Sequence, residues 1–287
     1  MPAWRVVRAT EIEFTDGQDD VASGLNTALL IGPADGAVHL EVALCRLDPG
    51  GSINAHVHPF EESFYVLEGE GLFAVADRAY HVTARSFGFS PVRTAHRWTN
   101  RSAKPLVWIR TRSPQSRVVG DAAGTHPVPD RIAEDSITSL DVADRARRYV
   151  GQFEEDMMPT PGPMQMKGFR SSAARNVAVW MLVDEVTGAV HHTKFCVRFD
   201  PTGSSLTLGG QHFHPFEETY YITGGKAVAH LEDESIEVGP GDLVFAGVNT
   251  LHGFSNLGTE PVRWIEMQAP NPPTSNAFFF KAEWQDR

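Results

Sequence analysis

The sequence predicts an all-β protein of two similar antiparallel barrels or sandwiches in tandem, and two observations support this fold class. The chain repeats itself: HVHPFEESFYVLEG at 56–69 and HFHPFEETYYITGG at 212–225 agree at eight of 14 positions. Each repeat is divided into short apolar runs, such as SFYVL and AVAHL, by turns rich in Gly, Pro and Asp. Such runs are typical of antiparallel sheets. Because the duplication covers most of the chain, both halves are expected to share one fold.

The repeat also sets the domain boundaries. Residues 36–49 and 188–201 agree at seven of 14 positions, and an offset of 156 residues holds from His56/His212 to Trp108/Trp264. We therefore assign residues 1–115 to an N-terminal barrel, 116–170 to a linker and 171–287 to a C-terminal barrel. The strongest helical pattern, Ser136–Val150, falls in the linker. The apolar tail 276–284 is expected to cap its own chain, and a homodimer is left open.

Composition excludes several classes of partner. The chain of 287 residues has 25 Lys and Arg against 36 Asp and Glu, a net charge of −11, so a basic surface for nucleic acid is not expected. The run of about 18 apolar residues that a membrane span requires is absent, and the N-terminus lacks a signal-peptide pattern. Cys45 and Cys196 indicate buried thiols rather than a disulfide framework. We expect a cytoplasmic protein that acts on a small molecule.

Histidines and glutamates recur at metal-ligand spacing in both halves. Side chains alternate faces along a strand, so His56, His58 and Glu62 share one face, and His96 can arrive on a neighbouring strand. The second half repeats the set with the same separation of 34 residues between the glutamate and the last histidine. Three imidazoles and one carboxylate suit a divalent transition metal such as Fe, Mn, Ni, Cu or Zn. One metal per half is therefore predicted, with these ligands: His56, His58, Glu62, His96, His212, His214, Glu218 and His252.

These residues resemble the motifs of the cupin family, and specifically of its two-domain members, the bicupins. The first motif, G-x5-HxH-x3-E-x6-G, is complete from Gly50 to Gly69, whereas the second half lacks its leading glycine at the expected position. In the family's second motif, Arg85 and Arg93 replace two turn glycines of the first half. The resemblance implies a double-stranded β-helix, or jelly roll, in each half, with a metal inside each barrel. It does not imply one reaction.

Strand alternation also predicts what surrounds each metal. Phe64 and Trp98 would line the first pocket, and Tyr220 and Phe254 the second, although bulky residues also simply fill small barrels. The phenol of Tyr220 is the candidate catalytic group, because it could donate a proton or bind an oxyanion. Its alternative is a packing role with the hydroxyl bonded to backbone.

The last predicted strands of the two halves, 108–112 and 264–268, differ in charge at matching positions. Arg110 corresponds to Glu266, and Arg112 corresponds to Gln268. Arg110 is assigned to the first pocket, because an inward Arg110 or Arg112 would clamp a carboxylate; the alternative, which the strand pattern favours for both, is a solvated position. Glu266 is assigned to the second pocket. Glu61 and Glu217 have the opposite parity from the ligand glutamates, so we expect surface or salt-bridged groups, with a role in holding a ligand histidine as the alternative. His39 and His191 are expected in strand pairing or a subunit contact.

Three functions are compatible with this pattern. The first choice is a dioxygenase-type oxidoreductase that acts on a small aromatic or enol-like substrate. The second is a non-redox hydrolase or isomerase, in which a Lewis-acid metal is assisted by Tyr220 or a metal-bound water. The third is a protein in which the metals only stabilise the barrels.

Overall fold

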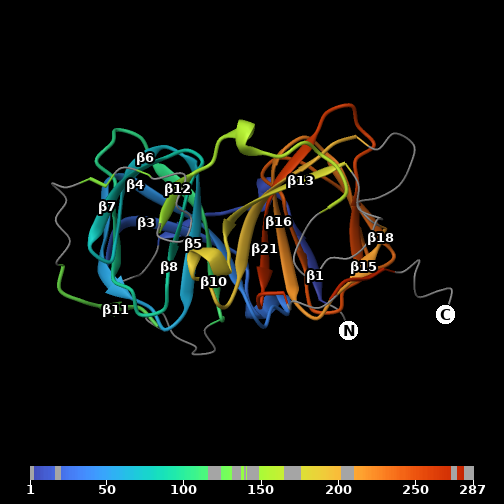
Figure 1. The fold of residues 1–287 in the computed structure, drawn as a ribbon. Helices are drawn as coiled ribbons and strands as arrows, with labels where there is room; N and C mark the ends of the chain where they lie inside the picture. The colour runs from blue at the N-terminus through green and yellow to red at the C-terminus, as the bar shows by residue number, and fades with distance from the viewer. Residues whose placement is uncertain are drawn as a thin grey trace.

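The predicted all-β class is confirmed. A computed structural model describes residues 3–16, 21–115, 124–130, 137–138, 140, 149–164, 176–201, 210–272 and 277–280, and within these ranges every helix is a single 3-10 turn. One barrel forms from each repeat, and the two lie side by side (Figure 1). Most of the helix predicted over Ser136–Val150 lies outside the described residues, and Val150 itself begins a strand. No described helix is long and apolar enough to cross a membrane.

The N-terminal barrel is one rolled sheet. Its strand order is β12-β8-β5-β10-β4-β9-β6-β7, with β11 and β3 also on β4 and β2 on β3. The chain runs through these strands: β2 (Thr15–Asp16), β3 (Ala22–Ile31), β4 (Glu41–Val57), β5 (Glu61–Glu68), β6 (Glu70–Val75), β7 (Arg78–Thr83), β8 (Ser86–Ser90), β9 (His96–Thr99), β10 (Leu106–Ser113), β11 (His126–Pro127) and β12 (Val150–Gln152).

The C-terminal barrel consists of two facing sheets, β1-β19-β16-β21-β14-β13 and β18-β17-β20-β15-β22. Its strands are β1 (Trp4–Val7), β13 (Val177–Val183), β14 (Thr193–Phe199), β15 (His212–Phe213), β16 (Glu217–Gly224), β17 (Ala227–Leu231), β18 (Glu234–Val238), β19 (Leu243–Ala246), β20 (His252–Ser255), β21 (Val262–Ala269) and β22 (Phe279–Phe280). The 3-10 turns are η1 (Ala9–Glu11), η2 (Pro33–Asp35), η4 (Glu155–Met157) and η5 (Glu185–Thr187).

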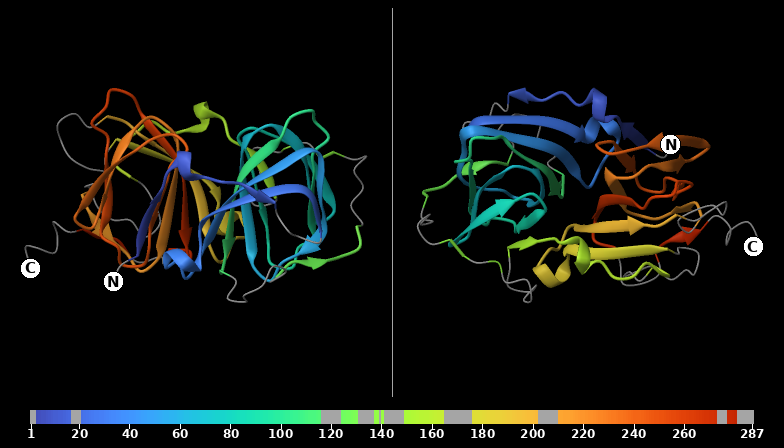
Figure 2. Two further views of the ribbon diagram at one scale, coloured as in Figure 1. Left: turned by 180° about the vertical axis from the view of Figure 1, so that it is seen from behind. Right: turned by 90° about the horizontal axis from the view of Figure 1, so that it is seen from above.

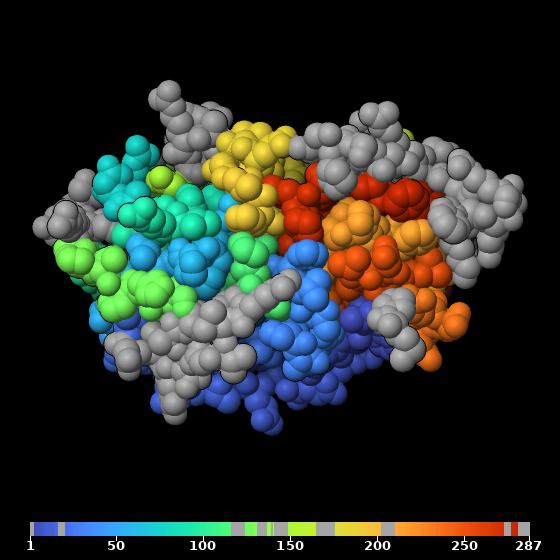
Figure 3. Space-filling model, turned by 90° about the horizontal axis from the view of Figure 1, so that it is seen from below, coloured from blue at the N-terminus to red at the C-terminus, as the bar shows by residue number. Residues whose placement is uncertain are grey.

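One strand crosses between the barrels, and a strand from the linker closes the first barrel. β1 stands at the start of the N-terminal half, yet it pairs with β19 of the C-terminal barrel. β12 follows the N-terminal barrel along the chain and completes it by pairing with β8, the counterpart of β19. The N-terminal residues consequently run along one edge of both halves, as the views from above and below show (Figures 2 and 3). The chain boundary near residue 115 therefore does not coincide with a boundary between the barrels.

Three apolar cores follow from strand alternation. Val66 belongs to the core inside the first barrel and Ile222 to the core inside the second. Their neighbours Tyr65 and Tyr221 face the other way, into a third core that both halves share. Burial of one sheet face against the partner barrel joins the two halves into one structure.

Turn geometry explains the motif glycines. Gly69 and Gly225 have φ of 81° and 72°, and a Cβ atom there would lie 2.2 Å and 2.5 Å from the carbonyl oxygens of Pro105 and Pro261. Only glycine fits a positive φ this close to another backbone. Arg85 also has a positive φ, 71°, where the second half has Gly241 with 89°. The turn geometry thus persists although the glycine is lost.

Candidate metal centres

Four ligand side chains converge in the C-terminal barrel. β15 supplies His212, β16 supplies Glu218 and β20 supplies His252, while His214 lies between the first two strands. One ligand atom from each lies within 4.8 Å of all the others. The Nε2 atoms of His214 and His252 are each 2.9 Å from Oε2 of Glu218. All four side chains are buried, so the second predicted ligand set is assembled in space.

The N-terminal barrel brings together only its three histidines, His56, His58 and His96. Glu62 is turned aside, with carboxylate oxygens 3.5 Å from His58 Nε2 and 3.9 Å from His96 Nε2. Nε of Arg112 instead donates a hydrogen bond of 2.8 Å to Glu62. The two predicted sites therefore differ, although their ligand sequences are the same.

A main-chain carbonyl orients every ligand imidazole. In all six histidines Nδ1 lies 2.7–3.3 Å from a main-chain carbonyl oxygen. A carbonyl can only accept, so Nδ1 carries the proton and the lone pair of Nε2 points into the centre. The carbonyls belong to Asn54, Gly124, Thr94, Gly210, Phe216 and Thr250.

The donor atoms fit a metal ion. Nε2 of His96 is buried and has no hydrogen-bond partner among the described residues, and Nε2 of His214 faces the carboxylate of Glu218, which has no proton to donate to it. A buried orphan acceptor is costly unless something else binds it. Burial also lowers the pKa of His56 to about 4 and of His96 to about 3, and it lowers the pKa of His212 and His214. Neutral imidazole is the form that binds metal.

Arg112 and Gln268 occupy matching positions in the two halves. Each donates a hydrogen bond to the ligand glutamate of its own half, but only Arg112 brings a positive charge. Nε2 of Gln268 donates a hydrogen bond of 2.6 Å to Oε1 of Glu218, which leaves Oε2 for the histidines. Burial opposes ionisation of Glu62, but the charge of Arg112 holds the pKa of that carboxyl well below its usual range. We expected a solvated Arg112, and this was wrong, because its even-numbered position faces the same side of the sheet as Glu62. Arg110 turns instead to Glu41, at 3.4 Å.

Tyr220 and Glu266 add proton-bearing groups beside the C-terminal centre. The hydroxyl of Tyr220 donates to Oε2 of Glu218, not to backbone. Burial, together with the charge of Glu218, raises the pKa of Tyr220 and of Glu266 well above their usual ranges. Glu266 lies within hydrogen-bond distance of the Trp264 indole, 2.9 Å, and of the Gln268 amide, 3.1 Å. Both acids are therefore expected to be protonated, and both can donate.

The predicted aromatic pocket residues fill the barrels. The ring centroids of Phe64 and Trp98 lie 4.6 Å apart, and those of Tyr220 and Phe254 lie 4.7 Å apart. Phe64, Trp98 and Phe254 are almost fully buried. These aromatic clusters form the barrel floors beneath the ligands, which is the packing alternative left open by the sequence.

Two phenylalanines outside the predicted ligand and pocket sets pack directly on the ligand histidines. Phe60 stacks on His58 and Phe216 on His214, with centroids 4.4 Å and 3.8 Å apart. The repeat of HPFEE in both halves was the signal that could have revealed them. Phe278 in the tail also lies 5.4 Å from His214, and β22 pairs with β15. The described part of the tail thus caps its own chain, as predicted.

Glu61 and Glu217 point away from the ligands, as their parity predicts, but they are buried rather than on the surface. Each carboxylate accepts hydrogen bonds from the backbone of the opposite half, at Val190–His191 and at Val38–Leu40. The recurring GAVH segments of His39 and His191 are therefore contacts between the two halves.

The fold and the two ligand sets can be compared with known proteins. The profile of the cupin domain matches residues 43–111 and 196–267, one match in each half. The chain is a two-domain cupin. This bicupin is 36% identical over 63 residues to an uncharacterised protein of Methanocaldococcus jannaschii, a match that spans 22% of this chain and 49% of that protein.

Solved structures share the fold over almost the whole chain. A putative glyoxylate-induced protein from Pseudomonas aeruginosa superposes with a TM-score of 0.63 and 16% identity, covering 93% of this chain and 89% of that one. Protein Ylba from E. coli gives 0.64 and 13%, covering 94% and 92%. Oxalate decarboxylase from Lactobacillus farciminis, solved as a formate complex, gives 0.63 and 14%, covering 98% and 89%. At these identities the likeness concerns the fold alone.

Proposed function

We propose that this bicupin is a metal-dependent dioxygenase-type oxidoreductase whose catalytic centre is the C-terminal site. The observation that carries the proposal is the convergence of His212, His214, Glu218 and His252. The substrate class is a small aromatic or enol-like molecule, because apolar rings from Phe216 and Phe278 border the ligands. Cofactors that fit are Fe, Mn, Ni or Cu, with Zn for the alternative below.

His212, His214, Glu218 and His252 would hold a divalent redox metal, which would supply the electron transfer that an oxygenation requires. The protein's own contribution is orientation. Gln268 and Tyr220 both donate to Glu218, so the carboxylate is fixed from two sides. Phe278 packs over His212 and His214 and restricts the access of water to that side of the centre.

A second candidate, a non-redox hydrolase or isomerase, is favoured by one specific observation. Tyr220 and Glu266 are two protonated acids within one buried network around Glu218. Such groups can move protons to a substrate that a Lewis-acid metal has polarised. In this reaction Tyr220 would act as the general acid.

Oxygen uptake separates the two candidates. Iron-loaded and manganese-loaded protein would be mixed with catechols, β-diketones and enols, with oxalate as a comparison because it is the substrate named for a structural neighbour. We expect oxygen consumption that is lost in His212→Ala and retained in His56→Ala. Tyr220→Phe should lower the turnover rate about 100-fold or more if proton transfer from Tyr220 limits turnover, as the second candidate requires. Turnover without oxygen uptake would favour the second candidate, and turnover that requires His56 but not His212 would contradict the assignment of the centre.

A further inference from the structure

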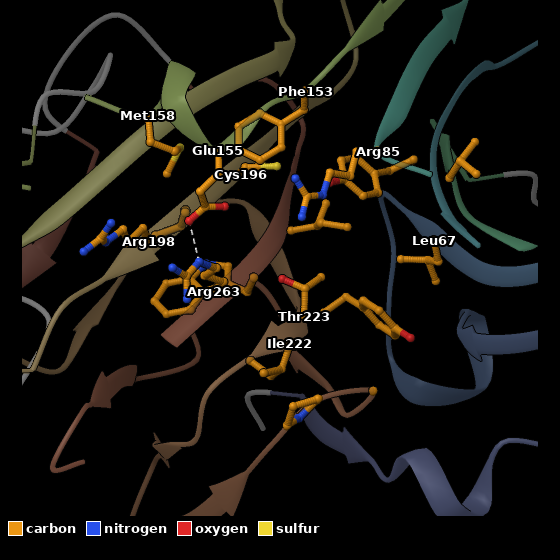
Figure 4. A pocket seen from close by; sticks show the side chains of 18 residues that line it. Leu67, Arg85, Phe153, Glu155, Met158, Cys196, Arg198, Ile222, Thr223 and Arg263 are labelled. Carbon is orange, nitrogen blue, oxygen red and sulfur yellow. Dashed lines mark hydrogen bonds and ion pairs between the residues drawn. The ribbon is translucent and has the colours of Figure 1, made fainter. Parts of the chain in front are cut away.

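A cavity of about 310 Å³ lies between the two barrels. Its floor is formed by β5, β16 and β21, and residues of the linker, Phe153, Glu155 and Met158, cover it (Figure 4). The space corresponds to on the order of ten liquid water molecules. It therefore suits a small organic molecule.

The cavity is separate from both metal centres. Val66 and Ile222 line it, and each lies four residues beyond the ligand glutamate of the same strand. Four residues of extended chain span about 13 Å. A ligand in this space would therefore be out of reach of the histidines, and the proposed oxidoreductase function does not explain it.

Cationic side chains dominate the polar lining. Arg85, Arg198 and Arg263 line the cavity with a single carboxylate, Glu155. Arg198 is already paired with Asp200, at 2.7 Å. Arg263 uses only Nε, which lies 2.5 Å from Glu155, and its two terminal nitrogens have no partner among the described residues.

Arg85 approaches the same space from the other barrel. Its nearest carboxylate, on Glu154, is 3.7 Å away and half exposed. Figure 4 shows Arg85 reaching in from one side and the Glu155–Arg263 pair from the other. Two guanidinium groups thus face each other across the cavity with unused donors between them.

The backbone of Arg85 gives independent support. Its φ of 71° is a left-handed conformation that favours glycine, and the matching residue of the second half is Gly241. Strained residues of this kind concentrate at functional sites. An arginine kept in this conformation, and directed into a cavity, indicates that its side chain has a role that the turn does not require.

Apolar side chains complete the walls. Tyr65, Ile265, Phe153 and Met158 line the cavity beside the guanidinium groups. An apolar lining with a few convergent polar groups is the usual composition of a small-molecule site. We propose that the cavity binds a small organic monocarboxylate, with the carboxylate between Arg85 and Arg263 and an apolar body against Ile265 and Phe153.

The test is calorimetric titration of the protein as purified with benzoate, and with benzamide as the uncharged analogue. We expect saturable binding of benzoate and at least tenfold weaker binding of benzamide, because each charge-assisted bond contributes a factor of about ten. Arg85→Gly and Arg263→Gln should each raise the Kd for benzoate about tenfold. Arg85→Gly should also raise the Tm, because it relieves the positive φ.

Arg46→Gln is the matched control, because Arg46 is the counterpart of Arg198 and lies over Phe14, away from the cavity. It should leave the Kd unchanged. The proposal is overturned if benzoate gives no saturable binding or if benzamide binds as tightly as benzoate. It is equally overturned if the arginine variants bind like the wild type, which is the result expected for a carboxylate bound at a metal centre.

Discussion

Glu61 and Glu217 occupy equivalent positions in the two repeats, and each carboxylate accepts hydrogen bonds from backbone amides of the opposite barrel. Oxygens of Glu61 lie 2.7 Å and 2.9 Å from the amides of Val190 and His191. Oxygens of Glu217 lie 2.6–3.1 Å from the amides of residues 38–40. Each ligand glutamate therefore follows a residue that anchors its strand to the other half.

Loss of one anchor should destabilise the whole chain. Glu217→Ala leaves three amides without their acceptor, and we expect the free energy of unfolding to fall by about 2–3 kcal/mol. Urea denaturation measures this change. Glu237→Ala is the control, because its pair with Lys226 is exposed and should contribute less than about 1 kcal/mol. Equal effects of the two substitutions would show that the anchor contributes little.

The Arg112 and Gln268 exchange should set the relative metal affinities. Arg112→Gln frees Glu62 to approach its histidines, and we expect metal binding in the N-terminal site to tighten about tenfold. Gln268→Arg should weaken the C-terminal site by about 10–100-fold, because the guanidinium would compete for Glu218. Titration against a metal chelator reports both changes. Affinities that do not respond to either substitution would contradict the role given to these two residues.

Stability should rise with pH because of one buried lysine. Lys194 is fully buried between the halves, its Nζ donates to the carbonyl of Ser63, and burial lowers its pKa to about 7. Above pH 7 the lysine ammonium of the folded chain loses its proton, whereas the lysine of the unfolded chain keeps it. The free energy of unfolding therefore increases with pH until the lysine of the unfolded chain also titrates. Between pH 7 and pH 9 the wild type should gain about 2 kcal/mol relative to Lys194→Met.

Urea denaturation at several pH values, with both proteins in the same metal state, tests this slope. Lys194→Met keeps the volume of the aliphatic stem and removes the titrating group. Parallel stability profiles for the two proteins would mean that Lys194 keeps an ordinary pKa in the folded state.

Substitution of two glycines by alanine should distinguish the cost of a positive φ from the cost of a steric clash. Gly188 has a φ of 96° and nothing within 4 Å of an added Cβ, whereas Gly69 has a positive φ and the Pro105 oxygen at 2.2 Å. Gly188→Ala should cost about 1–2 kcal/mol, from conformation alone. Gly69→Ala should cost distinctly more or prevent folding. Thermal denaturation and soluble yield compare the two, and an equal loss of Tm would show that the strand accommodates the clash.

The repeat and strand alternation predicted most of what lies near the metals. Even-numbered residues of β16 and β21 face the interior of the C-terminal barrel, which is why Glu218, Tyr220 and Gln268 meet there. The same rule placed Glu61 and Glu217 on the opposite face. Period-two alternation needs no knowledge of the partner strand, so it can be read from a single sequence.

What lies across the interface could not be predicted in this way. The pairing of β1 with β19 and of the linker strand β12 with β8 depends on packing between segments far apart in the chain. For the same reason Glu61 and Glu217 were expected as surface or salt-bridged groups, and not as acceptors for backbone amides of the other half. The preference of Glu62 for Arg112 over its histidines also depends on side-chain geometry, because both arrangements satisfy the same ligand spacing.

Elemental analysis of metal per chain, on protein purified without added metal, tests the central claim most directly. The wild type should contain at least about one equivalent of a divalent transition metal, and His212→Ala should lose about one equivalent. His56→Ala should affect only what the N-terminal site holds. A folded wild-type chain without metal, or one whose metal content is the same in His212→Ala, would contradict the account.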